Sequence, residues 1–174
     1  MDLRFILLET KGRLAPQPFA QGYILLTGAA LIITVVSTFF LEGLAILQYV
    51  LVFPYFCVFA KRFHDAGLSG WLWLVALFAY LVFSSLLSVL LMPILSPQAW
   101  TIYEEVSRLS QTQGMEAGMD ALAREGVELV RSAALSTVAS FLITSALIGF
   151  VTYRLRSEPH PNRHGLPPGA DTTF

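Results

Sequence analysis

The side chains best suited to chemistry lie together in residues 61–71, which read KRFHDAGLSGW. Basic residues, a histidine, an aspartate and a serine stand there between two long apolar runs. Such a group could catalyse, bind an anion or anchor the chain at a membrane surface. Catalysis by His64, Asp65 and Ser69 is disfavoured, because adjacent residues on a turn point apart and the chain has no G-x-S-x-G elbow. We therefore predict that the protein is not an enzyme and has no catalytic residue.

Metal binding is the next chemistry to consider. His160 and His164 are four residues apart, a spacing that places two ligands on one face of a helix. Pro159 and Pro161 deny this segment a regular helix, so a zinc site is not expected. The single cysteine, Cys57, lies within an apolar run and cannot form an internal disulfide. We predict no metal and no cofactor.

The composition is that of a membrane protein. Hydrophobic residues make up 55% of the chain and charged residues only 13%, whereas a soluble domain carries about 25% charged residues. The formal net charge is −1, so there is no basic excess of the kind that nucleic-acid binding requires. We expect membrane lipids as partners and no nucleic acid.

Four stretches are long and apolar enough to cross a bilayer, which takes about 20 residues. All four are free of charged residues; the second of them, at residues 43–60, is at the short end of the range and is bounded by Glu42 and by Lys61-Arg62. Backbone groups in lipid find no outside partner, so each span must be a helix. The sequence thus predicts an all-α, polytopic membrane protein with a four-helix transmembrane bundle. Its membrane domain, residues 19–153, contains spans at residues 19–41, 43–60, 71–95 and 133–153.

The basic residues indicate the orientation, because they are enriched on the cytoplasmic side of membranes. Eight of the eleven lie on one side of the predicted spans, namely Arg4, Lys11, Arg13, Lys61, Arg62, Arg154, Arg156 and Arg163. The other side holds Arg108, Arg124 and Arg131 among six acidic residues. We expect both termini and the loop at residues 61–70 to be cytoplasmic.

The segments outside the spans carry weaker patterns. Residues 1–18 predict a short interfacial helix, followed by an extended entry into the first span at Pro16 and Pro18. Residues 96–132 predict two amphipathic helices, separated at Gly114, on the outer membrane surface. A cover over a partner-binding groove is the alternative for that loop. Residues 154–174, rich in proline, predict an extended or disordered cytoplasmic tail.

An anchoring role explains most of residues 61–71. Lys61 and Arg62 are expected to end the second span, and Ser69 to cap the first turn of the third. Trp71 suits the membrane interface. These assignments leave His64 without a role.

The same stretch resembles the central signature of the DUF805 family, small bacterial inner-membrane proteins of unknown function. Gly12-Arg13 is similar to the motif that opens the first span in that family. The end of the chain is similar to the terminal element of the family through Ser157, Pro159, Asn162, Arg163, Gly165 and Pro167. The resemblance implies a multi-pass protein of the bacterial inner membrane and brings no assigned chemistry.

All three motifs fall on the predicted cytoplasmic side. We therefore expect one surface cluster there, with residues 62–65 touching the tail at residues 162–165. Its candidate members are Arg13, Arg62, His64, Asp65, Ser69, Gly70, Trp71, Asn162 and Arg163. Clustered arginines at an inner leaflet suit phosphate or acidic groups.

The leading hypothesis is thus a binding or scaffold protein whose cytoplasmic site takes a lipid headgroup or a protein partner. A small transporter or channel subunit, acting as a homo-oligomer, is the alternative. Transport needs a polar residue or a broken helix at mid-membrane, and only Gln48, Tyr49 and Pro54 approach that requirement.

Overall fold

The computed structural model describes residues 2–169, and all its regular elements in that range are helices. In chain order they are α1 (Leu3–Leu8), α2 (Pro16–Phe39), the 3₁₀ helix η1 (Glu42–Ile46), α3 (Leu47–Asp65), α4 (Leu72–Leu95), α5 (Pro97–Gln113), α6 (Met115–Ser132) and α7 (Ala134–Tyr153). Four segments are long and apolar enough to cross a membrane: α2, η1 with α3, α4 and α7. The predicted all-α fold with four spans is confirmed.

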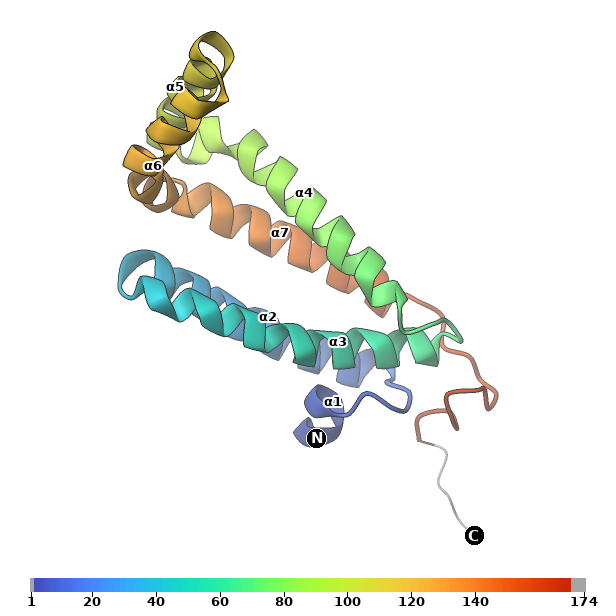
Figure 1. Ribbon diagram of the computed structural model, residues 1–174. Coiled ribbons are helices and arrows are strands. Elements are labelled where there is room, and N and C mark those ends of the chain that lie inside the picture. Colours follow the sequence, from blue (N-terminus) through green and yellow to red (C-terminus); the bar gives the residue numbers. More distant parts are fainter. Residues whose placement is uncertain (1, 170–174) are drawn as a thin grey trace.

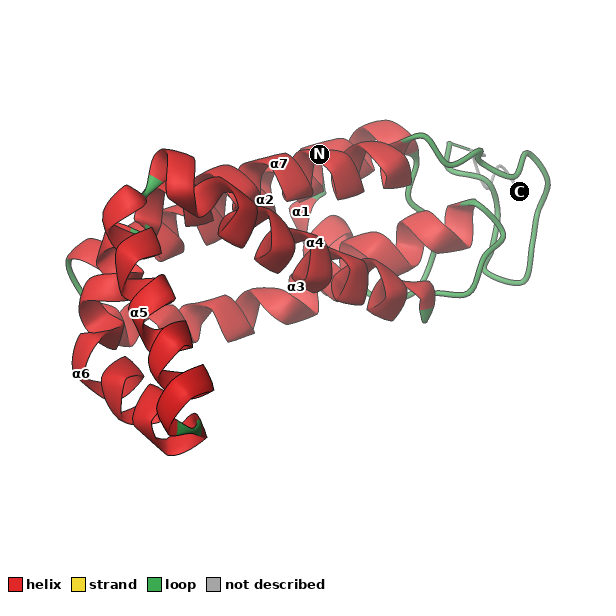
Figure 2. Ribbon diagram, turned by 90° about the horizontal axis from the view of Figure 1, so that it is seen from above, coloured by secondary structure: helices red, strands yellow, loops and turns green. Residues whose placement is uncertain are grey.

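The four long helices form two pairs, α2 with α3 and α4 with α7 (Figure 1). The pairs converge where α3 ends and diverge toward α5 and α6. The end at which the pairs converge contains Arg13, Lys61, Arg62 and the segment at residues 154–169, so we call it the basic end. The opposite end, formed by η1, α5 and α6, is called the far end. Seen from above, the α5–α6 hairpin covers the far end, and the loops of the basic end lie opposite it (Figure 2).

Helix α3 does not end where its charges begin. The prediction that Lys61 and Arg62 terminate it is wrong, because α3 continues to Asp65. Hydropathy marks where lipid contact ends, whereas the helix ends where its backbone hydrogen bonds are redirected. The Leu68 N–H donates to the Phe63 carbonyl at 2.9 Å and the Gly67 N–H to the His64 carbonyl at 3.1 Å. With Gly67 at φ +72°, this is a Schellman C-cap.

The beginnings of α4 and α2 also differ from expectation. Ser69 does not cap α4, which begins at Leu72, because its hydroxyl accepts only from the Trp71 N–H, at 3.4 Å. The Leu72 N–H instead bonds to the Ser69 carbonyl, so a tight backbone turn replaces the expected cap. The extended entry predicted at Pro16 and Pro18 is wrong, since α2 starts at Pro16. The first helical turn leaves its N–H groups free, so proline fits there without loss.

The outer loop is helical, as predicted, and its two helices separate at Gly114, where φ is +98°. α5 and α6 pack closely against each other, because Gly118 lets the backbones approach at Ser110. The hairpin runs across the ends of the long helices (Figure 1). Its placement on the outer membrane surface stays a prediction.

The main core lies toward the basic end. Phe19, Val58, Phe59 and Phe63 are buried there between α2 and α3, and Ile6 of α1 packs beneath them. Half of the residues of α4 are exposed and only Met92 is buried, as expected for a helix that faces lipid on one side. The buried face of α7 is a row of small residues, Ser136, Ser140, Thr144, Ser145 and Gly149. Such residues let membrane helices approach closely.

Candidate functional site

Asp65, the last residue of α3, is the centre of the basic end. Its side chain is fully buried, and each carboxylate oxygen accepts from two side-chain donors. Oδ1 accepts from Nε and Nη2 of Arg13, both at 3.2 Å. Oδ2 accepts from Nη1 of Arg62 and Oγ of Ser157, both at 2.5 Å. We call these four residues the Asp65 cluster; it joins the segment before α2, the end of α3 and the segment after α7.

The two arginines of this cluster also bond to backbone carbonyls. Arg13 Nη1 donates to the His160 carbonyl at 2.9 Å, and Nη2 donates to the Glu158 carbonyl. Arg62 donates to the carbonyls of Thr152 (3.3 Å), Tyr153 (3.0 Å) and Leu155. Those carbonyls stand at the C-terminal end of α7, where helical partners run out and where a positive charge is favourable. The Thr152 carbonyl also accepts from the Leu155 N–H, at 3.3 Å.

This arrangement decides what Arg13, Arg62 and Asp65 can do. Their guanidinium and carboxylate groups are buried and occupied by one another and by the backbone. A phosphate or an acidic partner would have to displace these bonds to reach them. The Asp65 cluster is therefore a closed structural contact, so any ligand site at the basic end lies beside it.

Lys61 forms a similar joint with α1. Its side chain is fully buried, and Nζ donates to the carbonyls of Phe5 and Ile6, the second at 3.1 Å. The ammonium also lies 4.3 Å from the centroid of the Phe5 ring. Lys61 was expected to face the inner leaflet, but here it holds α1 against α3.

The tail is ordered where it meets α3. Asn162 Nδ2 donates to the His64 carbonyl at 3.1 Å and to Glu158 Oε2 at 2.7 Å, and the Glu158 N–H donates to the Asp65 carbonyl at 2.8 Å. The expected contact between residues 62–65 and residues 162–165 is present. Of the two states predicted for the tail, extended or disordered, residues 154–169 take an ordered, non-helical one, while residues 170–174 lie outside the described range.

The remaining candidates border an open hollow of about 410 Å³ beside the Asp65 cluster. We call it the head pocket. Its lining comes from the loop before α2, the end of α3, the turn before α4 and the tail, and comprises Thr10, Phe56, Ala60, His64, Ser69, Gly70, Trp71, Arg163 and His164.

Two histidines form one wall of the head pocket. The His64 ring lies parallel to that of His164, with centroids 3.8 Å apart. Nδ1 of His64 is 3.2 Å from the Gly12 carbonyl, which can only accept, so Nδ1 carries a proton. Nε2 faces Gly70, where a side chain would come within 2.7 Å of it. The glycine is thus required by close packing.

Arg163 is the permanent cation of the head pocket. Its Nε donates to Nε2 of His164 at 3.0 Å. Burial lowers the pKa of His164, and the charge of Arg163 lowers this pKa further. His164 is therefore neutral at pH 7, and the guanidinium of Arg163 supplies the positive charge.

The nine candidates thus separate into two groups. Arg13, Arg62, Asp65 and Asn162 fasten chain segments together, whereas His64, Ser69, Gly70, Trp71 and Arg163 line the head pocket. Sequence reasoning did not select Ser157, Thr10 or His164. Ser157 stands in the terminal motif and could have been found there, but nothing near Thr10 in the sequence indicates a pocket.

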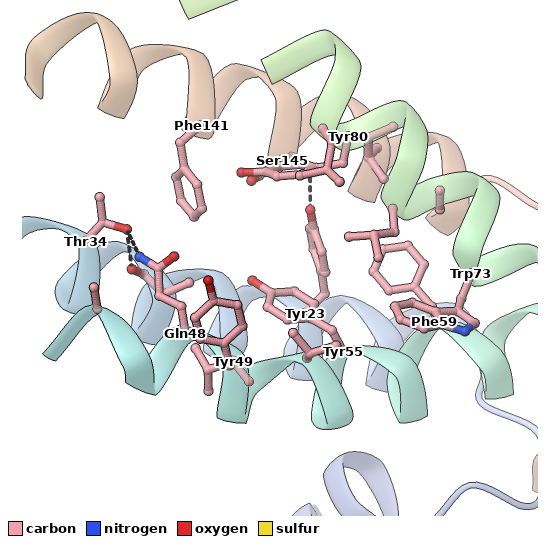
Figure 3. A pocket seen from close by; sticks show the side chains of 18 of the residues that line it. Tyr23, Thr34, Gln48, Tyr49, Tyr55, Phe59, Trp73, Tyr80, Phe141 and Ser145 are labelled. Atoms are coloured by element: carbon pink, nitrogen blue, oxygen red, sulfur yellow. Dashed lines mark hydrogen bonds between the residues drawn. The ribbon is translucent and has the colours of Figure 1, made fainter. Parts of the chain in front are cut away.

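A larger hollow of about 800 Å³ separates the two helix pairs (Figure 3). We call it the groove. Hydrogen bonds brace its walls: Tyr23 Oη donates to the Ser145 carbonyl at 2.8 Å, and Gln48 Nε2 donates to Thr34 Oγ1 at 2.9 Å. Of its lining residues, the sequence indicates only Gln48 and Tyr49 as polar groups near mid-membrane. Tyrosines inside apolar runs do not reveal which helix face they occupy.

Within the described residues, no three His, Cys, Asp or Glu side chains are grouped so that they could hold a metal ion. His64 and His164 are therefore a stacked pair, with no third ligand beside them.

Comparison with known proteins gives one match. The family model described as a protein of unknown function (DUF805) matches residues 7–166, nearly the whole chain. No curated protein and no solved structure matches. The matched range contains Gly12-Arg13, the end of α3 with its following turn, and most of the terminal motif, which are the segments that meet at the basic end. The chain belongs to the DUF805 family.

Proposed function

We propose that this protein is a non-enzymatic, multi-pass binding protein of the bacterial inner membrane that holds a phospholipid by its headgroup. The observation that carries the proposal is the head pocket, a hollow of about 410 Å³ at the basic end of the spans. Its volume lies within the range of small-molecule sites, about 300–1,000 Å³. It is open, in contrast to the closed Asp65 cluster beside it.

The chemistry of the lining suits a phosphate group. Arg163 brings a permanent charge, and Thr10 and Ser69 bring hydroxyls. Phosphate oxygens accept charge-assisted hydrogen bonds from such donors. Trp71 is 74% exposed at the start of α4, as expected for a residue at the level of lipid headgroups. These features favour an anionic lipid over a zwitterionic one.

The Asp65 cluster would prepare this pocket before a ligand arrives. Its bonds hold the end of α3, which carries His64, against the tail, which carries Arg163. Binding then requires little ordering of loops, which lowers its entropic cost. The packed basic end also favours binding over transport through a single subunit, because the Asp65 cluster closes that end between the helix pairs.

Lipid retention tests the proposal. The protein would be purified in a mild detergent, and retained phosphatidylglycerol and phosphatidylcholine would be counted by native mass spectrometry. Arg163→Gln should weaken phosphatidylglycerol binding by roughly 10-fold or more, the effect of losing a hydrogen bond to a charged group. Arg156→Gln is the matched control, because Arg156 lies exposed in the same tail and outside the pocket. Equal binding by wild type and Arg163→Gln would reject the headgroup site.

Orientation is a separate part of the proposal. Eight of the eleven basic residues lie at the basic end or in segments that adjoin it, so we place this end in the cytoplasm. Reporter fusions after Gly67 and Gly114 check the placement. A cytoplasmic signal is expected at Gly67 and a periplasmic one at Gly114, and the reverse pattern would invert the topology.

A further inference from the structure

We infer that the groove between the helix pairs binds an acyl chain of the lipid whose headgroup occupies the head pocket. The identity of the headgroup rests on the proposed function, whereas the chain site stands on the groove itself. The protein would then recognise an intact phospholipid through both of its parts.

The groove has the size and lining of a lipid-chain site. Its volume is about 800 Å³, and its walls are mainly apolar, including Ala76 and Ile148. Phe59 and Trp73 line it toward the basic end (Figure 3). It lies among helices that are suited to span a membrane, so it faces hydrocarbon. The bilayer core holds no water that could fill such a space. A lipid chain is therefore its natural occupant.

The contacts around the groove indicate where a chain enters. One side is closed by Tyr23 of α2, which packs so tightly on Gly149 of α7 that an added Cβ would lie 2.3 Å from the tyrosine ring. α4 and α7 pack along much of their length, whereas α3 makes far fewer contacts with α4. The rim residues Val52 of α3 and Leu81 of α4 are exposed. We place the entrance between α3 and α4.

The groove and the head pocket share a wall. Phe56 of α3 lines the head pocket, and Trp73 of α4 lines the groove. Their rings are in edge contact, with centroids 5.4 Å apart. One aromatic pair thus divides a polar hollow from an apolar one, at the same end of the same two helices. A phospholipid has the matching arrangement, with its phosphate next to the start of its chains.

Most polar side chains of the groove are paired within the protein and so do not indicate a polar ligand. Tyr23 is bonded to Ser145, Tyr55 Oη donates to Thr27 Oγ1 at 3.3 Å, and Gln48 is bonded to Thr34. These bonds connect helices of the protein. A ligand with a hydrogen-bonding ring, such as a quinone, would have to compete with them, whereas an aliphatic chain would not.

Fluorescence quenching by brominated lipid chains tests the inference. Trp71→Phe and Trp100→Phe leave Trp73 as the only one of the three tryptophans, and it lines the groove. Phosphatidylglycerol with brominated chains is added as a minor component of detergent micelles. We expect saturable quenching that unlabelled phosphatidylglycerol reverses and glycerol phosphate, which has no chain, does not.

Two substitutions on α4 form a matched pair. Ala76→Phe fills the groove and should weaken the saturable quenching by roughly 10-fold, equivalent to about two buried methylene groups. Val75→Phe introduces the same ring at an exposed position outside the groove and should leave quenching unchanged. Circular dichroism of both variants verifies that each is folded. If Ala76→Phe is misfolded, Ala30→Phe places the same bulk on the α2 wall.

The outcomes separate this inference from the proposed function. Saturable quenching that Ala76→Phe removes supports the chain site, even where Arg163→Gln shows no headgroup preference and the proposed function fails. Phosphatidylglycerol retention that depends on Arg163, without saturable quenching of Trp73, overturns the chain site and leaves the headgroup site standing. Quenching that is equal in Ala76→Phe and Val75→Phe, or reversed by a short-chain quinone in preference to phospholipid, also overturns it.

Discussion

The basic end and the far end hold the same helices together by different means. At the basic end, buried side chains cross between segments: Asp65 alone joins Arg13, Arg62 and Ser157. At the far end, the bonds stay within a helix pair: Gln48 donates to Thr34 between α3 and α2, and the buried Ser96 hydroxyl accepts from the Ser136 N–H between the end of α4 and α7. At the far end of α2, Phe39 and the adjoining Phe40 are exposed, whereas Phe19 at its other end is buried in the main core. The molecule is therefore a wedge that is fastened at one end (Figure 1).

The difference shows how a small membrane protein can keep a groove open. Lipid does not drive apolar helices together, so helix pairs associate where polar groups are paired or small residues allow close contact. Both conditions are met at the basic end, through the Asp65 cluster and through Gly149 against Tyr23. Toward the far end the pairs are free to diverge, and the groove lies between them.

Among the substitutions, removal of the Asp65 carboxylate should lower thermal stability the most. Asp65→Ala leaves two buried arginines without their carboxylate, and loss of one partner from a buried ion pair costs about 3–5 kcal/mol. We expect a large drop in the melting temperature in detergent, measured by circular dichroism. Glu105→Ala is the control at the far end, where the Arg108–Glu105 pair is exposed, and its melting temperature should not change measurably. Equal melting temperatures of the two variants would show that the Asp65 cluster does not hold the chain segments of the basic end together.

A substitution that pushes the two helix pairs apart should have the next largest effect on thermal stability. Gly149→Ala places a methyl group 2.3 Å from the Tyr23 ring, so the ring or the helix must move. Overpacking of this kind costs about 1–3 kcal/mol. Gly28→Ala is the matched control, because a methyl group there meets no atom within 4 Å. Thermal unfolding checks both variants, and Tyr23→Ala should relieve the effect of Gly149→Ala if this contact is the cause.

The four spans could be read from the sequence because exposure to lipid requires an apolar composition all around a helix, as in α4. The end of α3 could not be read in this way. A charge beside an apolar run can face water or can be buried with partners, and Arg13, one of the two arginine partners of Asp65, is 52 residues away. The motifs therefore predicted which segments meet, but they did not distinguish the buried joint from the open pocket.

The groove was missed for a related reason. Tyr23, Tyr55 and Tyr80 stand alone in apolar stretches of three different helices, and their common face depends on how the pairs pack. The uniform hydropathy of a membrane helix hides its orientation, whereas the serine row of α7 shows its packed face directly.

Weakening the attachment of the tail to α3 should reduce stability less than disrupting the contact between α2 and α7. Asn162→Ala removes the bonds to the His64 carbonyl and to Glu158, of which the first fastens the tail to α3. The expected cost is about 1 kcal/mol, the usual net value of a hydrogen bond. Hydrogen exchange of residues 158–166 should become faster, while exchange in the α5–α6 hairpin stays the same. Unchanged exchange in the tail would mean that the Asp65 cluster alone holds it.

Acid should produce the smallest change, confined to the head pocket. The pKa of His164 is lowered in the folded chain from its ordinary value of 6.5, so the folded state binds this proton less readily than the unfolded state. The stacking of His164 on His64 is therefore fully effective above pH 6.5 and weakens as the pH falls from there toward the lower, folded pKa. Hydrogen exchange near residue 164 should be faster at about pH 5.5 than at about pH 7.5, a range that brackets the ordinary histidine pKa. His64, the other ring of the stacked pair, is also a titratable imidazole. His164→Phe keeps an aromatic ring that cannot be protonated, and it should reduce the pH dependence to the part that His64 contributes, while the exchange of the far end stays unaltered. An undiminished dependence in that variant would show that the pocket wall does not respond to acid through His164.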